Sequence, residues 1–504
     1  MFITGAVEVE YTETETQGGK LMKKQVFNPY LPGYEYIPDG EPRVFGDRIY
    51  VYGSHDAFGG DNFCVNDYVL YSAPLDDLSS WRNDGVIYRK TQDPANRDGR
   101  MSMCAPDCVM GVDGRYYLYY QLHAKQYTSV AVASAPEGPF EYYGNVQHPD
   151  GTPWGEKKGD SFIFDPGVLV DDDGRVYLYA GFAPTGLFKK ILKMRGNRVE
   201  ESVCLELEGD MKTVKGGEKP VAPGPDKAKG TPFDGHAFFE ASSIRKINGR
   251  YYYVYSSILS HELCWAVSSC PDRDFSFGGT LISNGDIGYG GRTEADNYTG
   301  NTHGGMAQIN GEWYIFYHRQ TNRQKCCRQG AAEKLTFLSD GSIAQSEMTS
   351  CGLNGGPLEG SGRYPTRIAC TLSSVAGTFP YLRVREKDRK NIHPYFTQSG
   401  TDREKDDDQY IANMKSGSTA GFRYFSFTKP FRLSVRVRGN AEGRVDVRKE
   451  ENGGVIMSIP VKPSSSWTEY EEKESIHLDG GYPLFFTFTG NGALDFESFE
   501  IMTE

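Results

Sequence analysis

A tight turn followed by an aromatic strand recurs five times between residues 26 and 350 of this sequence. The five copies are GDRIYVYGSHD from Gly46, DGRYYLYYQLH from Asp113, DGRVYLYAGFA from Asp173, NGRYYYVYSSI from Asn248 and NGEWYIFYHRQ from Asn310. Asp-Gly and Asn-Gly accept positive φ angles, so we expect two-residue hairpin turns of type I′, each followed by a half-buried strand. The copies recur about every 60 to 75 residues, which is long enough for a four-stranded sheet and its loops.

All-β repeats with this kind of period close into β-propellers, so the sequence predicts five blades over residues 26–350. An antiparallel sandwich, in which aromatic hairpins are also common, is the alternative for this region. Further short alternating runs follow it, namely FRYFSF, RLSVRVRG, RVDVRKE, GVIMSIPV and PLFFTFTG. Turn residues separate these runs, as in a sandwich. The predicted fold is therefore all-β, a five-bladed β-propeller followed by a C-terminal β-sandwich of jelly-roll type.

The predicted boundaries follow changes in composition along the chain. Residues 1–25 are polar and expected to be a disordered extension, residues 26–350 form the propeller, the Gly-rich stretch 351–362 is a linker, and residues 363–504 form the sandwich. The charged segment TDREKDDDQ from Thr401 is interpreted as a solvated loop rather than a metal site.

The overall charge restricts the partners that such a chain can bind. A net charge of −12 argues against nucleic acid and anionic membranes as partners, and favours a neutral ligand. No apolar run is long enough to span a bilayer, and the N-terminus lacks the pattern of a secretory signal, so we expect a cytoplasmic protein. The 10 cysteines are expected to be small buried thiols, because no paired Cys knuckles or His cluster predicts a zinc site. The number of subunits is not predicted.

An ionisable residue precedes each aromatic hairpin by a similar distance, about eight to ten positions before the residue that follows the turn. These residues are Asp39, Asp107, Asp165, Glu240 and His303. Equivalent positions of a propeller converge on one axis, so four carboxylates and a histidine are expected to meet there. Such crowding costs free energy through repulsion and desolvation, which makes a functional site the better explanation.

Crowded carboxyl groups have different pKa values, so that one keeps its proton while a neighbour is ionised. Such a pair supplies the acid and the base that hydrolysis of a glycosidic bond needs. The separation of the two groups decides between inversion and retention of configuration, and it is not readable from sequence. Aromatic rings near such a site can stack on sugars or belong to the core. The candidates are Phe164, Phe238, Phe239 and Trp265.

Three of these motifs closely resemble glycoside hydrolase family 43, a family of five-bladed propellers. Asp39 in NPYLPGYEYIPDGEPRVFGDRIYVYGSHD matches the general base. Asp165 in FIFDPGVLVDDDGRVYLYAG matches the aspartate that raises the pKa of the acid and orients it, and Glu240 in FFEASSIRKINGRYYYVYSS matches the general acid. The resemblance covers most of residues 26–350. It implies an inverting, single-displacement mechanism that requires no cofactor.

The resemblance also suggests roles for neighbouring residues. Arg328 resembles the arginine that approaches the substrate and the acid, and Phe164, Phe239 and His303 are the other expected substrate contacts. His303 is either the neighbour of a structural calcium ion at the propeller centre or a hydrogen-bonded structural residue. Asp107 is expected to be structural or to orient the substrate.

Two departures from the family pattern concern the substrate. The base is followed by Gly40 rather than proline, and the acid by Ala241-Ser242 rather than Gly-Pro, which leaves the subfamily open. The expected activity is an exo-acting β-xylosidase, α-L-arabinofuranosidase, or both, on short neutral plant-derived oligosaccharides. The alternatives are an arabinan-, galactan- or galactofuranose-directed hydrolase and a non-catalytic glycan-binding propeller. The C-terminal region resembles a family 6 carbohydrate-binding module, and either sugar binding or a purely structural role is compatible with its sequence.

Overall fold

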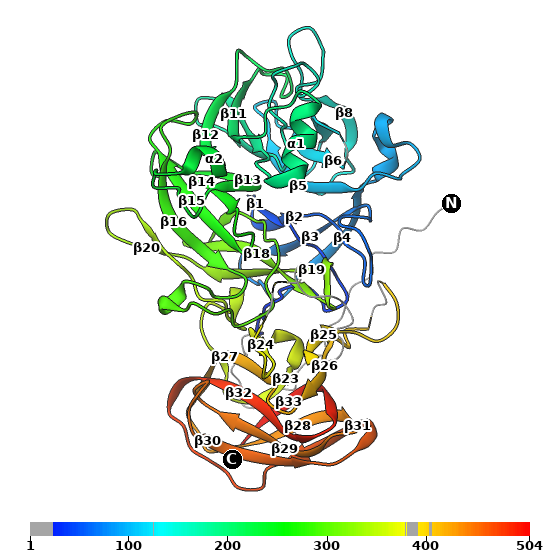
Figure 1. Cartoon of the computed structure of the whole chain (residues 1–504), viewed down its shortest axis with the longest axis vertical. Helices are drawn as coiled ribbons and strands as arrows, with labels where there is room; N and C mark the ends of the chain where they lie inside the picture. The colour runs from blue at the N-terminus through cyan, green and yellow to red at the C-terminus, as the bar shows by residue number, and fades with distance from the viewer. Residues whose placement is uncertain (1–23, 124, 379, 381–391, 403–405) are drawn as a thin grey trace.

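The computed structural model describes residues 24–123, 125–378, 380, 392–402 and 406–504. It consists of a large body of radial sheets and a smaller sandwich below it (Figure 1). The predicted disordered extension, residues 1–25, lies almost wholly outside the described residues. The all-β prediction is confirmed, including the propeller and the C-terminal sandwich.

Five antiparallel sheets make up the propeller, and each is one blade. Blades 1 and 2 are β1 (Glu41–Phe45), β2 (Arg48–Tyr52), β3 (Tyr68–Pro74), β4 (Arg82–Tyr88), and β5 (Met103–Met110), β6 (Tyr116–Leu122), β7 (Thr128–Ala133), β8 (Glu141–Asn145). Blades 3 and 4 are β9 (Gly167–Val170), β10 (Val176–Gly181), β11 (Glu201–Leu207), β12 (Lys219–Pro223), and β13 (Phe238–Ile247), β14 (Arg250–Ser257), β15 (Glu262–Ser268), β16 (Ser276–Ser283). Blade 5 has three strands, β17 (Met306–Ile309), β18 (Glu312–Thr321) and β19 (Gln324–Lys334).

The first strand of every blade faces the central axis. β1 contacts β5, β5 contacts β9, β9 contacts β13, β13 contacts β17, and β17 contacts β1 again. The innermost strands therefore form a closed ring. Residues at the start of these five strands meet at one end of the axis, which we call the entry end.

The predicted hairpin turns are confirmed in only part of the ring. Asn248-Gly249 and Asn310-Gly311 are two-residue turns with positive φ at both positions, as type I′ requires. In blades 2 and 3 the Asp-Gly pair lies in a five-residue loop, because pairing resumes at Met110↔Tyr116 and Val170↔Val176. The expectation of a two-residue turn was wrong there. Gly111 and Asp171 end the first strand early by donating to carbonyls across the loop.

Tyrosine-rich strands supply much of the packing between blades, in keeping with the aromatic repeat. Tyr68, Tyr88 and Tyr120 lie in one buried cluster between blades 1 and 2, and the hydroxyl groups of Tyr88 and Tyr120 are 2.9 Å apart. Buried hydroxyl groups need such partners, so each ring contributes apolar area without leaving its polar end unpaired.

The sandwich packs two sheets face to face. One sheet contains β22 (Leu358–Glu359), β24 (Thr371–Ser373), β27 (Thr419–Phe427), β29 (Glu442–Arg448), β30 (Val455–Val461) and β32 (Gly480–Asn491). The other contains β23 (Gly362–Pro365), β25 (Tyr395–Thr397), β26 (Tyr410–Lys415), β28 (Phe431–Gly439), β31 (Ser464–Glu471) and β33 (Ala493–Thr503). Phe422, Phe486 and Phe499 lie in the core between the sheets. The five runs from which strands were expected all overlap these strands and extend at most two residues beyond them.

The remaining elements are short. They are β20 (Thr336–Phe337), β21 (Ile343–Ala344), α1 (Gly186–Met194), α2 (Pro225–Ala228), η1 (Lys90–Gln92), η2 (Pro94–Asn96), η3 (Tyr289–Gly291), η4 (Gly352–Asn354) and η5 (Thr366–Ile368). Within the described part of the chain, no helix combines the length and apolarity that a bilayer span requires. All ten cysteines are free, and all but Cys270 are buried.

The two domains are joined by direct hydrogen bonds. Arg319 of β18 donates to the carbonyl oxygen of Ala369 over 2.6 Å, and the backbone N–H of Asn322 donates to Phe396 over 2.8 Å. The Phe58 N–H donates to Asp402 over 2.7 Å. Asp402 belongs to the segment expected to be a solvated loop, so its described part instead contacts the propeller.

Candidate active site

The predicted catalytic residues come together at the entry end of the ring. Asp39 lies two residues before β1, Asp165 lies two residues before β9, and Glu240 lies at an irregularity in the pairing of β13 with β14. Asp39 and Asp165 have φ angles of 56° and 51°, and Ala241 next to Glu240 has 68°. Non-glycine residues in this region are strained and are frequent at functional sites.

Asp39 is a buried carboxylate held by a cation. Arg328 of β19 donates from Nη1 to Asp39 Oδ1 over 2.8 Å, and the Asp39 backbone N–H donates to Nδ1 of His318 over 3.1 Å. Burial pulls the pKa of Asp39 upward, but the Arg328 charge, together with smaller contributions from His318, His303 and Ser54, outweighs it and holds the pKa at about 2. Asp39 is thus ionised at neutral pH.

Arg328 has a second carboxylate partner that the sequence reasoning missed. Its Nε donates to Asp56 Oδ2 over 2.8 Å, and its Nη2 donates to Asp56 Oδ1 over 3.0 Å. Asp56 is fully buried at the end of the first aromatic repeat, in the segment GSHD that follows β2, and no pattern in the sequence distinguished it from an exposed loop residue. This two-point bond fixes the plane of the guanidinium group that faces Asp39.

Asp165 and Glu240 form an acidic pair. Burial and the charges of Glu240 and Asp39 raise the pKa of Asp165 well above its ordinary value. Burial and the Asp39 charge raise the pKa of Glu240 to about 8. Asp165 Oδ2 accepts from the Ala241 N–H over 3.2 Å, which ties it to the strand that carries Glu240. The pair therefore retains a proton at neutral pH.

Two buried histidines lie beside these acids. His303 Nδ1 is 3.6 Å from Asp165 Oδ2, and burial lowers its pKa to about 4. His318, which the sequence reasoning missed, has its pKa lowered to about 3 by burial and by Arg328. Both imidazoles are neutral at neutral pH. The available signal for His318 was a histidine directly after the aromatic run of the fifth repeat, in YHR.

The described side chains do not form a calcium cage at the ring centre. Calcium takes six to eight oxygen ligands, whereas His303 and His318 offer nitrogen. Among the described residues, no group of three ligating side chains converges at this place. A calcium ion here would take nearly all its ligands from water.

Asp107 lies in the channel but not in the acidic pair. Arg43 donates to it from Nε over 2.9 Å, and the Val168 N–H donates to its Oδ2 over 2.7 Å. A second ion pair joins blades 4 and 1, because Arg245 donates from Nη2 to Glu41 Oε1 over 2.6 Å. These bonds link the innermost strands of blades 1 to 4. Of the two roles expected for Asp107, its contacts support the structural one.

The predicted aromatic contacts divide into two groups. Phe164 and Phe239 are half-buried and both pack against Phe182, at ring distances of 5.2 and 5.3 Å. Phe238 and Trp265 are buried core residues, which is the second of the two roles considered for these rings. Their side chains point into the packing between blades because neighbouring positions of a strand face opposite sides.

Phe63 is a further aromatic residue that the sequence reasoning missed. The Arg328 guanidinium lies 4.7 Å from the centre of its ring, and both Phe63 and Phe164 pack on a small cluster of Cys64, Cys104 and Ala105. Half-buried rings thus lie near both Asp39 and Asp165. Such rings suit the apolar faces of a sugar.

An ionised carboxylate and a protonated carboxyl group at one place can act as base and acid on a single substrate. Hydrolysis of a glycosidic bond needs this combination. The half-buried rings and the neutral histidines favour an uncharged ligand over an ionic one.

Comparison with known proteins agrees with this chemistry. The model of the family described as glycosyl hydrolases family 43 matches residues 38–343. A xylosidase/arabinosidase of Thermoclostridium stercorarium is 47% identical over 489 residues, covering 96% of this chain and 100% of the relative. A β-xylosidase of Xylanibacter ruminicola is 29% identical over 312 residues, covering 57% of this chain and 89% of the relative.

A solved structure resembles both domains together. The family 43 arabinoxylan arabinofuranohydrolase of Bacillus subtilis, in complex with cellotetraose, covers 95% of this chain and 97% of its own, with a TM-score of 0.50 and 20% identity. At this identity the likeness concerns the fold alone.

Proposed function

Because this chain belongs to glycosyl hydrolase family 43, we propose that it releases terminal xylosyl and arabinofuranosyl units with Asp39 as base and Glu240 as acid. The chain is a glycosidase of the β-xylosidase and α-L-arabinofuranosidase type. Its proposed substrates are short neutral oligosaccharides, on which it acts from the end of the chain. The relative that matches over its whole length supports this pair of sugars through its name.

The observation that carries the proposal is the opposite protonation of two carboxyl groups. Arg328 keeps the pKa of Asp39 at about 2, whereas burial and the Asp39 charge raise the pKa of Glu240 to about 8. Between these values Asp39 is ready to accept a proton and Glu240 is ready to donate one. A glycan-binding propeller without catalysis has no need of an acid with a raised pKa.

The proposed reaction is a single displacement. Asp39 takes a proton from water as the water oxygen attacks the anomeric carbon, and Glu240 gives its proton to the departing glycosidic oxygen. Asp165 is proposed to orient Glu240 through its bond to the Ala241 N–H and to raise the pKa of Glu240 when ionised. Arg328, Phe164, Phe239 and His303 are the proposed substrate contacts.

The test is the configuration of the first product. Proton NMR during hydrolysis of 4-nitrophenyl β-D-xyloside is expected to show α-xylose before mutarotation. Release of β-xylose would contradict the single displacement, and absence of release from both the β-xyloside and the α-L-arabinofuranoside would contradict the substrate assignment.

A structural calcium ion beside His303 also stands as a proposal, with water supplying most of its ligands. It rests on the family resemblance and not on the chemistry above. Calcium that restores a melting temperature lowered by EDTA would support it. An unchanged melting temperature after EDTA treatment would contradict it.

A further inference from the structure

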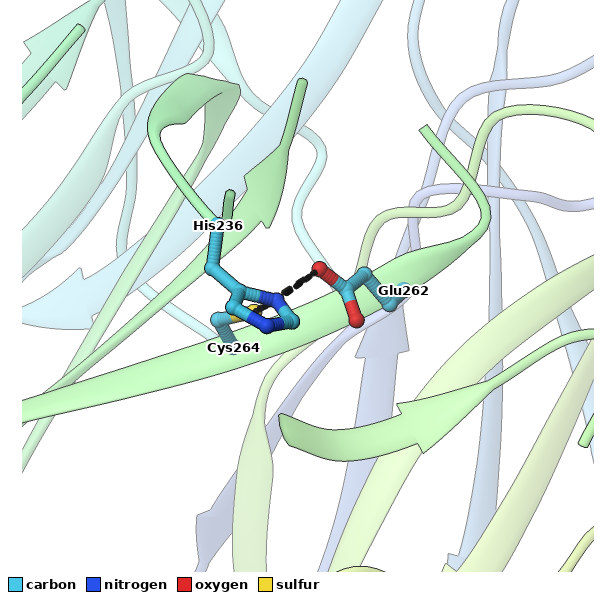
Figure 2. Close-up of side chains that lie close together, drawn as sticks. All are labelled: His236, Glu262 and Cys264. Carbon is cyan, nitrogen blue, oxygen red and sulfur yellow. Dashed lines mark hydrogen bonds and ion pairs between the residues drawn. The ribbon is translucent and has the colours of Figure 1, made fainter. Parts of the chain in front are cut away.

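Three side chains with metal-binding atoms converge in blade 4, apart from the acids of the candidate active site. They are His236, in the loop before β13, and Glu262 and Cys264, on β15 (Figure 2). Glu262 and Cys264 are buried, and His236 is partly exposed. In the described part of the chain, this is the only place where three such side chains offer ligand atoms within 4.8 Å of one another.

The separations of the ligand atoms are close to those of a tetrahedral site. His236 Nδ1 is 2.7 Å from Glu262 Oε1, Cys264 Sγ is 3.3 Å from the same oxygen, and Cys264 Sγ is 3.9 Å from His236 Nδ1. Zinc bond lengths of about 2.0 to 2.3 Å place tetrahedral ligands roughly 3.3 to 3.6 Å apart. Small movements of the partly exposed imidazole would bring all three into range.

Neighbouring residues hold the three ligands in place. Ser257 and Thr280 donate to the two oxygens of Glu262 over 2.6 and 2.9 Å. The His236 ring stacks on Phe277 with 5.3 Å between ring centres, and the Tyr255 hydroxyl donates to the His236 carbonyl over 2.8 Å. Supporting contacts of this kind are typical of metal sites, since they fix the orientation of the ligands before the ion arrives.

From this arrangement we propose that His236, Glu262 and Cys264 bind a transition-metal ion of the zinc class. A thiolate and an imidazole favour zinc over calcium or magnesium, which prefer oxygen. The Cys264 thiol loses its proton to solvent as the metal–sulfur bond forms, and water takes the fourth position. No sequence motif indicated this site, because its residues do not follow the spacing of a zinc knuckle.

The position of the site connects it to the fold around the acid. The ion would join the loop that leads into β13 to β15, the third strand of the same blade, and β13 carries Glu240 a few residues farther on. The metal would therefore stabilise the start of the strand that positions the acid, without contacting the substrate.

The test uses the full-length chain without a polyhistidine tag, titrated with Co²⁺ as a spectroscopic probe after chelator treatment. We expect one Co²⁺ per chain with a thiolate-to-cobalt absorption band that zinc abolishes by competition. Zinc is also expected to raise the melting temperature. Absence of the thiolate band in the wild-type protein would overturn the proposal.

Three variants assign the band to these residues. Cys264→Ser is expected to abolish it, and His236→Gln to weaken Co²⁺ binding by about tenfold or more. Cys270→Ser, which changes another thiol of the same blade, is the matched control and is expected to leave the band unchanged. A band retained in Cys264→Ser would overturn the proposal. If Cys264→Ser does not fold, wild-type affinity in His236→Gln, whose side chain is partly exposed, would overturn it as well.

Discussion

Arg328 Nη1 donates to Asp39 Oδ1 over 2.8 Å, although the two residues are 289 positions apart in the chain. The bond joins the third strand of the last blade to the start of the first. Closure of the ring is therefore also what gives Asp39 its charge.

The pH dependence of activity is expected to follow the two carboxyl groups. Glu240 must be protonated, so kcat/KM should fall as the pH rises through about 8. Asp39 must be ionised, so activity should be lost only as the pH falls through about 2. Measurement of kcat/KM on xylobiose from pH 4 to 10 checks this. A fall centred near pH 5 on the acidic side would contradict the assignment of Asp39.

Substitutions of the two carboxyl groups are expected to differ by substrate. Asp39→Asn should lower kcat by about 10²- to 10⁴-fold on xylobiose and on the 4-nitrophenyl glycoside, because no leaving group replaces the base. Glu240→Gln should cause a similar loss on xylobiose but a smaller one on the activated glycoside. Equal losses for Glu240→Gln on both substrates would argue against its role as acid. Unchanged circular dichroism serves as the folding control.

Loss of the arginine charge is expected to move the acidic limb of the pH profile. In Arg328→Met the pKa of Asp39 should rise, since burial then acts without an opposing cation, and activity should decline at a higher pH than in the wild type. Arg328→Lys, which retains a charge, should restore part of the difference. The exposed Arg175→Met is the control, and an identical acidic limb in Arg328→Met would contradict the prediction.

Gly304 is expected to tolerate no side chain. A Cβ atom at this position would lie 1.9 Å from the carbonyl oxygen of Phe316, so Gly304→Ala must shift the backbone next to His303. We expect a loss of about 1 to 3 kcal/mol in the free energy of unfolding together with reduced activity. Gly209→Ala, where a Cβ meets nothing within 4 Å, is the control. Chemical denaturation of both variants measures the difference.

A buried arginine at the interface of the domains is expected to be essential for stability. Arg423 donates to Asp286 over 2.9 Å and to Glu347 over 2.7 Å. Arg423→Leu leaves buried acids without a cation and should cost about 3 to 5 kcal/mol. The exposed Lys429→Met should cost little. A melting temperature of Arg423→Leu equal to that of the wild type would contradict this.

The repeat made the propeller and the meeting of its acidic residues predictable from the sequence, whereas the roles proposed for these residues came from the family resemblance. Five copies of one hairpin require equivalent positions, so Asp39, Asp165 and Glu240 were expected at one end of the axis without any knowledge of contacts. The same symmetry placed Asp107 among the acids but did not reveal Arg43, which neutralises it. Which side chains form ion pairs between blades depends on their length and direction in three dimensions, and a repeat pattern in the sequence does not contain this information.

Other residues of the site left weaker signals. Three of them contact Arg328 or Asp39, namely Asp56, His318 and Phe63. These contacts join the first blade to the last, so the local sequence does not reveal them. Phe238 and Trp265 pack between blades, and residue type alone did not distinguish such core rings from the rings beside the site. The turns of blades 2 and 3 differed because hydrogen bonds across a longer loop replaced the tight turn.

The hydrogen bond from the Phe58 N–H to Asp402 ties the sandwich to a propeller loop near Asp39. The loop that contains Phe58 also carries Asp56 and Phe63, which hold and cover Arg328, so the sandwich braces the segment that sets the charge of the base. Exchange of the sandwich between relatives would disturb catalysis even if that domain never touches a sugar.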